Sequence, residues 1–587
     1  MMRTKKGATG VALAAVVALA AAACSSSGGG TGTATGSAGG GGGGGAAAQK
    51  GGSLYLINND AHNGLDPQQS YVGADLEFAS RVYSRSLTTY STGKDAKLIP
   101  DLATDTGTMS DGGKTWKFTL VDTAKWQDGQ PVKCEDVKYG ISRTFATDVI
   151  SNGPTYILQY LDIPPKKGPD GKDALAYNGP YKNEGADLYD KAVTCEGQTL
   201  TLHLKTPWAD FNYAAASLAA FSPFRKDQDK GDKSLFEAFS DGPYMLQGAF
   251  DKNSGGTWVR NPNWDEKTDP VRKAYPDKIV TIQGPTSETI YQRLLADSGE
   301  DKTAITFVTA PASLLPQIVS NPTAQSRTSN PTAPYVDYVQ PNVTSKVMSN
   351  PKIRQAFAMA TNRDAYVTAN GGKQVMEPSY AVCNKLLACY KDFNPFGAPT
   401  SGDPAGAKKL LTDNGITTPV NITVEYRKTA TRDNAFAALK QTWDAGGFNV
   451  TLEGVANTGY YRAISNPAMK DKDAFYASWG ADWPSGSTDI PPLLDGRINL
   501  SPAGTNQDYG YYNNPEVNKA IDAAYLIPDA AAREKAWGDI DEQINKDGGI
   551  IPLVNQKFVF LRGSSVKNYE INPQFGGYAD LATLAVK

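Results

Sequence analysis

The sequence predicts a protein of mixed α/β (α+β) class, because strand and helix signals alternate along most of its length. With 587 residues it is too long for one hydrophobic core and corresponds to about three or four domains of roughly 150 residues each. An apolar share of 40% and a mean hydropathy of -0.41 are ordinary for a globular chain and argue against a multi-pass membrane protein. The 58 Lys and Arg residues nearly balance the 61 Asp and Glu residues, which argues against a nucleic-acid-binding protein.

Three short segments have the pattern of β-strands. Residues 54–57 form an uninterrupted apolar run, which is typical of a buried strand. In residues 116–120 and 200–204 large apolar side chains alternate with polar ones, which is the period of a half-buried strand. The second alternation puts His203 on the polar face, where we expect a solvated side chain.

Three further segments have apolar side chains at the spacing of helical turns. The first begins after the acidic pair Glu135–Asp136, which suits the positive N-terminal end of a helix. The last is followed by Gly548–Gly549, a typical end signal. We interpret all three apolar stripes as core-packing faces: Val137, Ile141 and Phe145; Ile353, Phe357 and Ala360; and Ala536, Ile540 and Ile544.

The N-terminus has the composition of an export signal followed by a tether. Residues 1–23 carry basic side chains and then an apolar run from Val11 to Ala23, which is shorter than the about 20 residues needed to span a bilayer but suits a signal peptide. Cys24 follows directly, as in a bacterial lipobox, although Ala21 stands where Leu is usual. Cleavage without lipidation is the alternative. Residues 24–50 are rich in Ser, Gly, Thr and Ala, and we expect them to be a lipid-anchored, flexible linker.

The four remaining cysteines are an even number, as an exported, oxidising environment favours. Cys383 and Cys389 are six positions apart and are expected to close a small loop, which leaves Cys134 and Cys195 as a second pair. Spacing alone does not fix this connectivity. A four-cysteine zinc site is the alternative, but the C-x-x-C spacing typical of such sites is absent.

The sequence offers little that supports catalysis. Its only histidines are His62 and His203, which argues against a histidine-based triad and against a multi-histidine metal site. The common motifs of nucleotide-binding loops, zinc proteases, calcium loops and serine hydrolases are absent. We therefore expect no enzymatic activity, no cofactor and no bound metal, and we expect His62 to have a structural or surface role.

A series of separated segments carries a resemblance to one protein family. The strongest is Trp126–Val132, which continues through Glu135-Asp136-Val137 to Arg143. The others are Leu65-Asp66-Pro67, Arg81–Leu87, Pro100–Ala103, Asp111–Phe118, Gly242-Pro243-Tyr244, Arg260–Trp264, Ile353–Phe357, Asn362-Arg363, Trp479–Trp483 and Ile551-Pro552-Leu553. In this order, over most of residues 51–587, the segments resemble the family 5 extracytoplasmic solute-binding proteins of ABC importers, the peptide-binding group.

The resemblance implies a two-lobed fold like that of periplasmic binding proteins (type II, class C), with a hinged cleft between the lobes and an extra inserted domain. It divides the chain into domain I (51–93, 240–339 and 553–587), domain II (94–239) and domain III (340–552). It also implies a monomer that is lipid-anchored on the outer face of the cell membrane, captures oligopeptides and delivers them to an ABC permease and its ATPase.

The resemblance further implies a ligand site. In peptide-binding members an Asp three residues after a Trp pairs with the α-ammonium of the ligand, and Trp479 and Asp482 match this pattern. Tyr71, Gly73 and Tyr156 fall in segments that line the cleft in relatives. The alternative is that Asp482 caps the bend at Asp482-Trp483-Pro484 and that Trp479 belongs to the core.

One departure from the family pattern leaves the ligand open. Oligopeptide binders hold the peptide carboxylate with basic residues shortly before that Trp, but here Tyr476 stands three positions before Trp479. The nearest cations in the sequence are Lys470 and Lys472, with Arg462 further back. A nickel chelate, an oligosaccharide or haem therefore stays an alternative ligand. A ligand-sensing receptor without transport and an exported hydrolase stay alternative roles.

Overall fold

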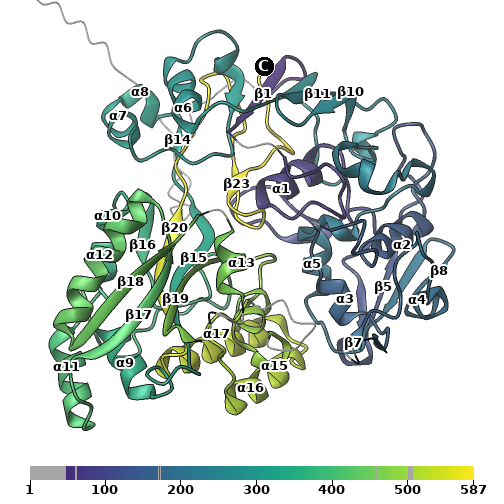
Figure 1. The fold of residues 1–587 in the computed structure, drawn as a ribbon. Helices are drawn as coiled ribbons and strands as arrows, with labels where there is room; N and C mark the ends of the chain where they lie inside the picture. Colours follow the sequence, from purple (N-terminus) through teal and green to yellow (C-terminus); the bar gives the residue numbers. More distant parts are fainter. Residues whose placement is uncertain are drawn as a thin grey trace, which may run out of the picture. The chain divides into compact units, whose positions relative to one another are not determined.

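Three sheets of four or more strands organise the protein in a computed structural model (Figure 1). The structure describes residues 48–59, 62–151, 153–169, 171, 173–457, 459–466, 469, 471–499 and 507–587, which belong to one compact unit, Ala48–Lys587. The predicted signal peptide (1–23), the lipidation of Cys24 and the predicted linker up to residue 47 lie outside the described residues. Within the described ranges, no helix has the length and apolar character needed to cross a bilayer.

The first sheet places the predicted strand at 54–57 in its interior. Strand β1 (Ser53–Asn58) is parallel both to β12, with Leu56 opposite Thr281, and to β13. Leu54 and Leu56 pack into one core cluster and Ile57 into another, so both faces of β1 are covered, which explains its continuous apolar run. The sheet has the strand order β10 (Tyr244–Asp251), β11 (Gly255–Arg260), β12 (Lys278–Gln283), β1 and β13 (Ala304–Ile305).

The second sheet brings together the two alternating segments. Strand β5 (Thr115–Thr119) pairs antiparallel with β9 (Thr199–His203), so that Trp116 lies opposite Leu202. Both side chains are buried, while His203 is half-buried at the strand end. A disulfide between Cys134 and Cys195 joins helix α2 to this sheet. The strand order is β4 (Thr108–Ser110), β5, β9 and β8 (Val193–Glu196), with α2 (Cys134–Arg143), α3 (Tyr156–Tyr160), α4 (Ala186–Ala192) and α5 (Phe211–Ser217) in the same part of the chain.

The third sheet is the largest and is mixed. Strand β15 (Thr332–Pro341) is antiparallel to both of its neighbours, whereas β17 is parallel to β18 and β19. Its full order is β16 (Met376–Pro378), β20 (Ile551–Lys557), β15, β19 (Ala474–Gly480), β17 (Val420–Arg427) and β18 (Phe448–Val455). The helices of this part are α9 (Pro351–Met359), α10 (Arg363–Ala369), α11 (Pro404–Asp413), α12 (Ala430–Ala445), α13 (Tyr460–Ile464), α14 (Ile490–Leu494), α15 (Gly496–Asn499), α16 (Pro515–Tyr525) and α17 (Ala530–Lys546).

The three predicted helices are confirmed as α2, α9 and α17. At the start of α2 the Asp136 carboxylate accepts a hydrogen bond from the Lys133 amide at 3.0 Å, as an acidic first turn predicts. Val137 and Ile141 on the predicted apolar stripe are fully buried. The second disulfide, Cys383–Cys389, closes a short loop whose cysteines belong to the core of the third sheet.

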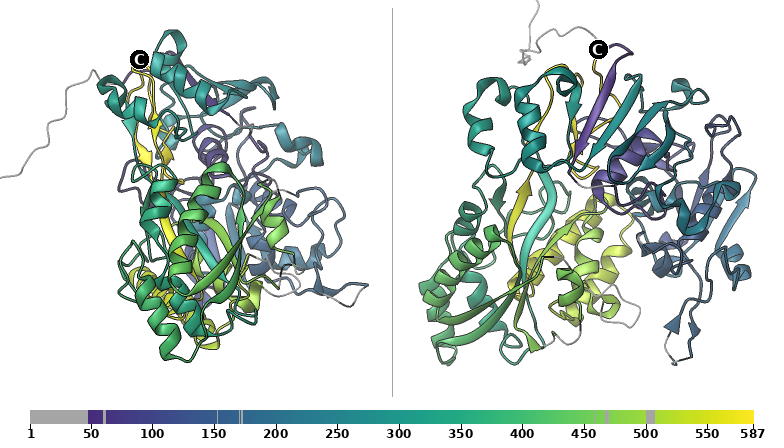
Figure 2. Two further views of the ribbon diagram at one scale, coloured as in Figure 1. Left: turned by 60° about the vertical axis from the view of Figure 1, so that its left-hand side comes forward. Right: turned by 45° about the horizontal axis from the view of Figure 1, so that its top comes forward.

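Strands β15 and β20 run side by side into the third sheet in Figures 1 and 2. The expected limits of domains I and III, after residues 339 and 552, fall inside these two strands. Their pairing is irregular between Thr332 and Val336 and again between Asp337 and Tyr338. The pair therefore forms the connection between the elements around the first sheet and those around the third.

Four further α-helices and four two-stranded pairs complete the described α-helices and strands. They are α1 (Gly73–Val82), α6 (Ser287–Ala296), α7 (Leu315–Ser320), α8 (Pro322–Gln325) and the strand pairs β2–β3 (Thr88–Tyr90, Leu98–Pro100), β6–β7 (Lys166–Lys167, Asp173–Ala174), β14–β21 (Thr328–Ser329, Phe560–Leu561) and β22–β23 (Ile571–Asn572, Tyr578–Ala579).

Candidate functional site

Four of the five residues that the sequence suggests as ligand contacts line one cavity of about 290 Å³. Tyr71 precedes α1 and Gly73 is its first residue, while Trp479 and Asp482 come from the end of β19 and the bend after it. The other lining residues are Val72, Leu76, Ser217, Pro334, Tyr335, Gly480, Ala481, Gln507, Gln574, Phe575 and Gly576.

The Asp482 carboxylate is held by two tyrosine hydroxyls. The hydroxyl of Tyr71 donates to Asp482 Oδ2 at 2.7 Å, and the hydroxyl of Tyr156 donates to the same oxygen. The two hydroxyl oxygens are 3.4 Å apart. Tyr156, the fifth suggested residue, therefore reaches the site through Asp482. The three residues come from segments assigned to domains I, II and III, so this cluster exists only where all three segments meet.

Burial raises the pKa of the Asp482 carboxyl to about 6, although the hydrogen bonds from Tyr156 and Tyr71 favour its charged form. Burial and the neighbouring Asp482 charge also raise the pKa of both phenols well above 10, so both hydroxyls keep their protons. Among the described residues that line the cavity, Asp482 carries the only charged side chain. The cavity thus presents one carboxylate without a cationic partner in its wall.

Trp479 both lines the cavity and packs against the core of the third sheet. Its indole donates to the Thr488 carbonyl at 2.9 Å, and the Thr488 hydroxyl accepts from the Asp482 amide at 2.9 Å. The carboxylate of Asp482 is engaged by the tyrosines, and its backbone is held by Thr488. This arrangement fixes the bend that carries Asp482 at the cavity wall.

Gly480 brings backbone to the cavity wall. A Cβ at this position would lie 2.4 Å from the Tyr335 ring, which is closer than atoms can approach, so the close approach of β19 to Tyr335 needs glycine. Strand β15 covers one edge of β19 along its length, while β17 covers the other edge only at Ala474 and Phe475. Beyond that point part of the β19 edge is open to side chains.

Two tyrosine hydroxyls occupy the first part of this open edge. Tyr460 donates to the carbonyl of Tyr476 at 2.7 Å. The Tyr461 hydroxyl lies 3.3 Å from the amide nitrogen of Ser478 and 3.4 Å from its carbonyl oxygen. Because alternate residues of a strand direct their backbone groups to the same edge, the amide and carbonyl of Gly480 face the edge that Tyr476 and Ser478 face.

A buried ionic cluster around Asp210, which includes Ser485 and Ser487 from the segment after Asp482, was not found from the sequence. Asp210, at the start of α5, accepts hydrogen bonds from Arg533 at 2.7 Å, from Ser487 at 2.7 Å and from Ser485 at 2.9 Å. Ser485 also donates to Glu534. All five side chains are buried, and burial raises the pKa of Glu534 to about 7. Asp210 and Arg533 are 323 positions apart, so no local pattern reports their pairing.

Trp483 is a second contact that sequence reasoning missed. It follows Asp482 in the chain, is 2% exposed and belongs to the core of the second sheet. Its ring centroid lies 5.0 Å from that of Tyr156 and 5.6 Å from that of Trp208. The segment from Asp482 to Ser487 thus joins the parts of the chain around the second and third sheets by tyrosine, tryptophan and Asp210 contacts.

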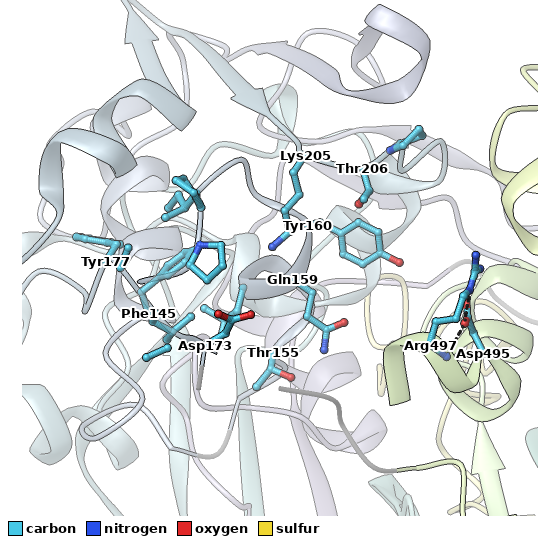
Figure 3. A pocket seen from close by; sticks show the side chains of 18 of the residues that line it. Phe145, Thr155, Gln159, Tyr160, Asp173, Tyr177, Lys205, Thr206, Asp495 and Arg497 are labelled. Carbon is cyan, nitrogen blue, oxygen red and sulfur yellow. Dashed lines mark hydrogen bonds and ion pairs between the residues drawn. The ribbon is translucent and has the colours of Figure 1, made fainter. Parts of the chain in front are cut away.

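A larger cavity of about 1100 Å³ adjoins α3 and contains none of the predicted ligand residues (Figure 3). Its wall is mainly apolar. Lys205 lies on the side formed by the second-sheet segment, and Arg497 lies on the opposite side with its guanidinium bound to Asp495 and Asp522. The hydroxyls of Tyr160 and Tyr525 are 3.2 Å apart at the boundary between the two sides.

Of the cations near Trp479 in the sequence, Lys472 and Arg462 do not line the 290 Å³ cavity. Tyr476 is fully buried, and its hydroxyl accepts from Arg432 Nε at 3.1 Å. Lys472 is paired with Glu425 and Glu453, and Arg462 is exposed. Lys470 lies outside the described residues.

His62 is buried and its Nδ1 is paired with Asp75, which agrees with a structural role. In the part of the chain that the structure describes, no three His, Cys, Asp or Glu side chains are grouped as a metal site would require.

Comparison with known proteins gives a family match and several relatives. The family model described as "Bacterial extracellular solute-binding proteins, family 5 Middle" matches residues 97–500. The glutathione-binding protein GsiB of Salmonella typhi is 23% identical over 510 residues, which are 84% of this chain and 87% of that protein. The periplasmic oligopeptide-binding protein OppA of Salmonella typhimurium is 24% identical over 475 residues, 79% of each chain.

The fold is also similar to that of solved structures. The clavulanic acid biosynthesis oligopeptide binding protein 2 superposes with a TM-score of 0.83 and 26% identity, over 92% of this chain and 96% of that one. The periplasmic murein tripeptide binding protein MppA, in its unliganded open form, superposes with a TM-score of 0.70 and 19% identity, over 92% and 99%. The predicted two-lobed α/β fold is confirmed.

Proposed function

Because the chain belongs to the bacterial extracellular solute-binding proteins of family 5, we propose that it captures peptides outside the cytoplasm and delivers them to an ABC import permease. The relatives support this ligand class, since two carry the description oligopeptide-binding and one the description glutathione-binding. We also propose that Cys24 is acylated and anchors the protein to the outer face of the membrane.

The observation that carries the proposal is the Asp482 carboxylate in its cavity. A protonated α-amine placed there would form a charge-assisted hydrogen bond with Asp482, worth about 1.5–3 kcal/mol. The adjacent backbone of Gly480 lies at an open strand edge, where the main chain of an extended peptide finds a donor and an acceptor. Asp482 would bind the amino terminus of the peptide, and the strand edge would bind its main chain. Neither contact depends on the side chains of the peptide, so peptides of different sequence could bind.

The contacts of the segment 482–487 support a capture mechanism by closure. Asp482 meets Tyr71 and Tyr156, Trp483 meets Trp208, and Ser487 meets Asp210. These contacts join segments assigned to all three domains, so an opening of the lobes would break them together. A ligand that bridges Asp482 and the Tyr71 side of the cavity would therefore favour the closed form.

Isothermal titration calorimetry with unmodified and N-acetylated alanine peptides tests the proposed function. We expect binding of the free amines, a loss for the acetylated forms, and a loss for the free amines in Asp482→Asn. The exposed Asp413, paired with Lys409, offers a matched carboxylate-to-amide control outside the site. A protein that ignores every peptide but binds a nickel chelate or an oligosaccharide would contradict the peptide assignment.

The anchor is tested separately by mass spectrometry of the mature N-terminus. Acylated Cys24 as the first residue supports the proposal, and Cys24→Ser is expected to release the protein from the membrane fraction. An unmodified Cys24 in membrane-bound protein would contradict it.

A further inference from the structure

Tyr461, which sequence reasoning did not single out, does not line the cavity around Asp482 but binds the edge of β19 two residues before Gly480. Tyr461 lies on α13, and its hydroxyl is within 3.3 Å of the Ser478 amide nitrogen and 3.4 Å of the Ser478 carbonyl oxygen. Its ring stacks on that of Tyr509 at 6.2 Å, and the Arg427 guanidinium lies 5.8 Å from its centre. These contacts hold the hydroxyl in place at the strand edge.

This position limits how far a ligand main chain can follow β19. Gly480 and Ser478 are the successive residues whose backbone groups face the open edge, about 7 Å apart along the strand. Gly480 lines the cavity, but both backbone groups of Ser478 are already engaged by Tyr461. A peptide that starts at Asp482 and pairs with Gly480 therefore reaches the Tyr461 hydroxyl after about two or three residues.

The volume agrees with a short ligand. The cavity of about 290 Å³ lies just below the range of roughly 300–1,000 Å³ that is typical of small-molecule sites. The larger cavity beside α3 shares no lining residue with it, so the ligand has no direct continuation there within the described walls.

The cavity wall offers a charged partner only to the amino terminus of such a peptide. Asp482 is the single charged side chain among the described lining residues, and residues 500–506, which precede Gln507 in the chain, contain no Lys or Arg. A buried carboxylate of the ligand would stay without a countercharge, which is costly. The polar side chains available to it are the amides of Gln507 and Gln574 and the hydroxyls of Ser217 and Tyr335.

We infer that this cavity selects a peptide of about two or three residues by its free α-ammonium and not by its C-terminal carboxylate, and that the Tyr461 hydroxyl sets this length by closing the edge of β19 beyond Gly480. The inference rests on the proposed function and names the ligand class of the same site. It also disfavours ligands with a surplus of carboxylates, such as glutathione, because the wall offers them no cation.

Calorimetry on the wild type with Ala-Ala, tri-alanine, penta-alanine, Ala-Ala amide and glutathione tests the ligand class. We expect penta-alanine to bind at least about tenfold more weakly than Ala-Ala, because a longer chain must displace the Tyr461 hydroxyl from two backbone groups. The Kd of Ala-Ala amide is expected to lie within about threefold of that of Ala-Ala, since the described cavity wall offers no cation to bind the carboxylate. Glutathione is expected to bind more weakly than either.

The variant Tyr461→Phe keeps the ring and removes only the hydroxyl that holds Ser478. We expect it to bind Ala-Ala as the wild type does and to narrow the gap between Ala-Ala and penta-alanine to about threefold or less. Tyr460→Phe, whose hydroxyl binds the carbonyl of Tyr476 further from the cavity, is the matched control and is expected to leave the gap unchanged. Thermal unfolding of each variant verifies that it is folded.

The outcomes separate this inference from the proposed function. Equal binding of Ala-Ala and penta-alanine by the wild type, or a gap that Tyr461→Phe leaves unchanged, overturns the length limit. A loss of more than about tenfold on amidation overturns the end-group selectivity. If no peptide of any length binds, the proposed function fails and the inference fails with it.

Discussion

Replacing Asp482 by Asn removes one charge at the centre of the candidate site and keeps the shape of the side chain. The carboxyl has its pKa raised from 3.8 to about 6 by burial, so the folded, ligand-free protein disfavours the charged form. At pH 7 the group is nevertheless ionised. The buried charge therefore destabilises the ligand-free fold. We expect the Asp482→Asn variant to have a higher free energy of unfolding than the wild type and to bind peptides more weakly.

The magnitude follows from the shift. About two pKa units correspond to about 3 kcal/mol at 1.36 kcal/mol per unit, which is an upper value for the free energy of unfolding gained at pH 7. For a folded body of this size that is about 2–3 °C in Tm. Because the native pKa lies above the unfolded one, the favourable contribution of Asp482 is complete below about pH 4 and is lost as the pH rises to about 6. The difference between variant and wild type should therefore vanish at low pH.

Calorimetric unfolding at pH 4 and pH 7, together with peptide titration at pH 7, measures both effects. The expected loss of affinity is about tenfold to a hundredfold, from a charge-assisted hydrogen bond of about 1.5–3 kcal/mol. Asp413→Asn should change neither quantity. An Asp482→Asn variant with unchanged affinity and with unchanged stability at both pH values would refute the assignment of Asp482 as the ammonium-binding group.

Three further predictions concern the pH dependence of ligand binding and the stability of the fold. Peptide affinity should fall below pH 6 by up to about tenfold per unit, because the ligand needs ionised Asp482; a flat titration profile between pH 4.5 and 7 contradicts this. Asp210→Ala leaves Arg533 buried without its carboxylate and should lower the free energy of unfolding by about 3–5 kcal/mol in chemical denaturation. The double variant Asp210→Ala with Arg533→Met should recover part of this loss, and an equal loss in both variants would contradict the pairing. Replacing Cys134 and Cys195 by Ser removes a disulfide between residues 61 positions apart and should lower the free energy of unfolding by about 4 kcal/mol. Removing the Cys383–Cys389 disulfide, whose cysteines are six positions apart, should lower it by about 2 kcal/mol, and equal losses in Tm would argue against the loop-entropy explanation.

Periodic patterns in the sequence predicted the elements that depend on local burial. The run at 54–57 is continuous because both faces of β1 pack against core side chains, and the alternations at 116–120 and 200–204 correspond to two paired strands of one sheet. The helix stripe that begins after Glu135–Asp136 is one buried face of α2. Such patterns report whether a side chain faces a core, and they carry this information without reference to distant residues.

The family resemblance selected residues of the candidate site, but not the contacts among them. Tyr71, Tyr156 and Asp482 were each expected near the cleft, and the structure joins them through one carboxylate across 411 and 326 positions of sequence. That Trp479 both lines the cavity and packs on the core could not be decided from its motif, because both roles need the same aromatic side chain.

The sequence alone determined the alternation of strands and helices, the family and a short set of candidate residues, since these depend on periodicity and on ordered motifs along the chain. Only the tertiary structure decided that Asp482 is the single charged side chain among the described residues of the cavity wall, that Arg533 pairs with Asp210, and that the Tyr461 hydroxyl binds Ser478 on the edge of β19. The reason is physical: a charge or a hydroxyl acquires its partner when the folded backbone brings distant side chains within about 3 Å, and periodicity contains no record of which ones meet.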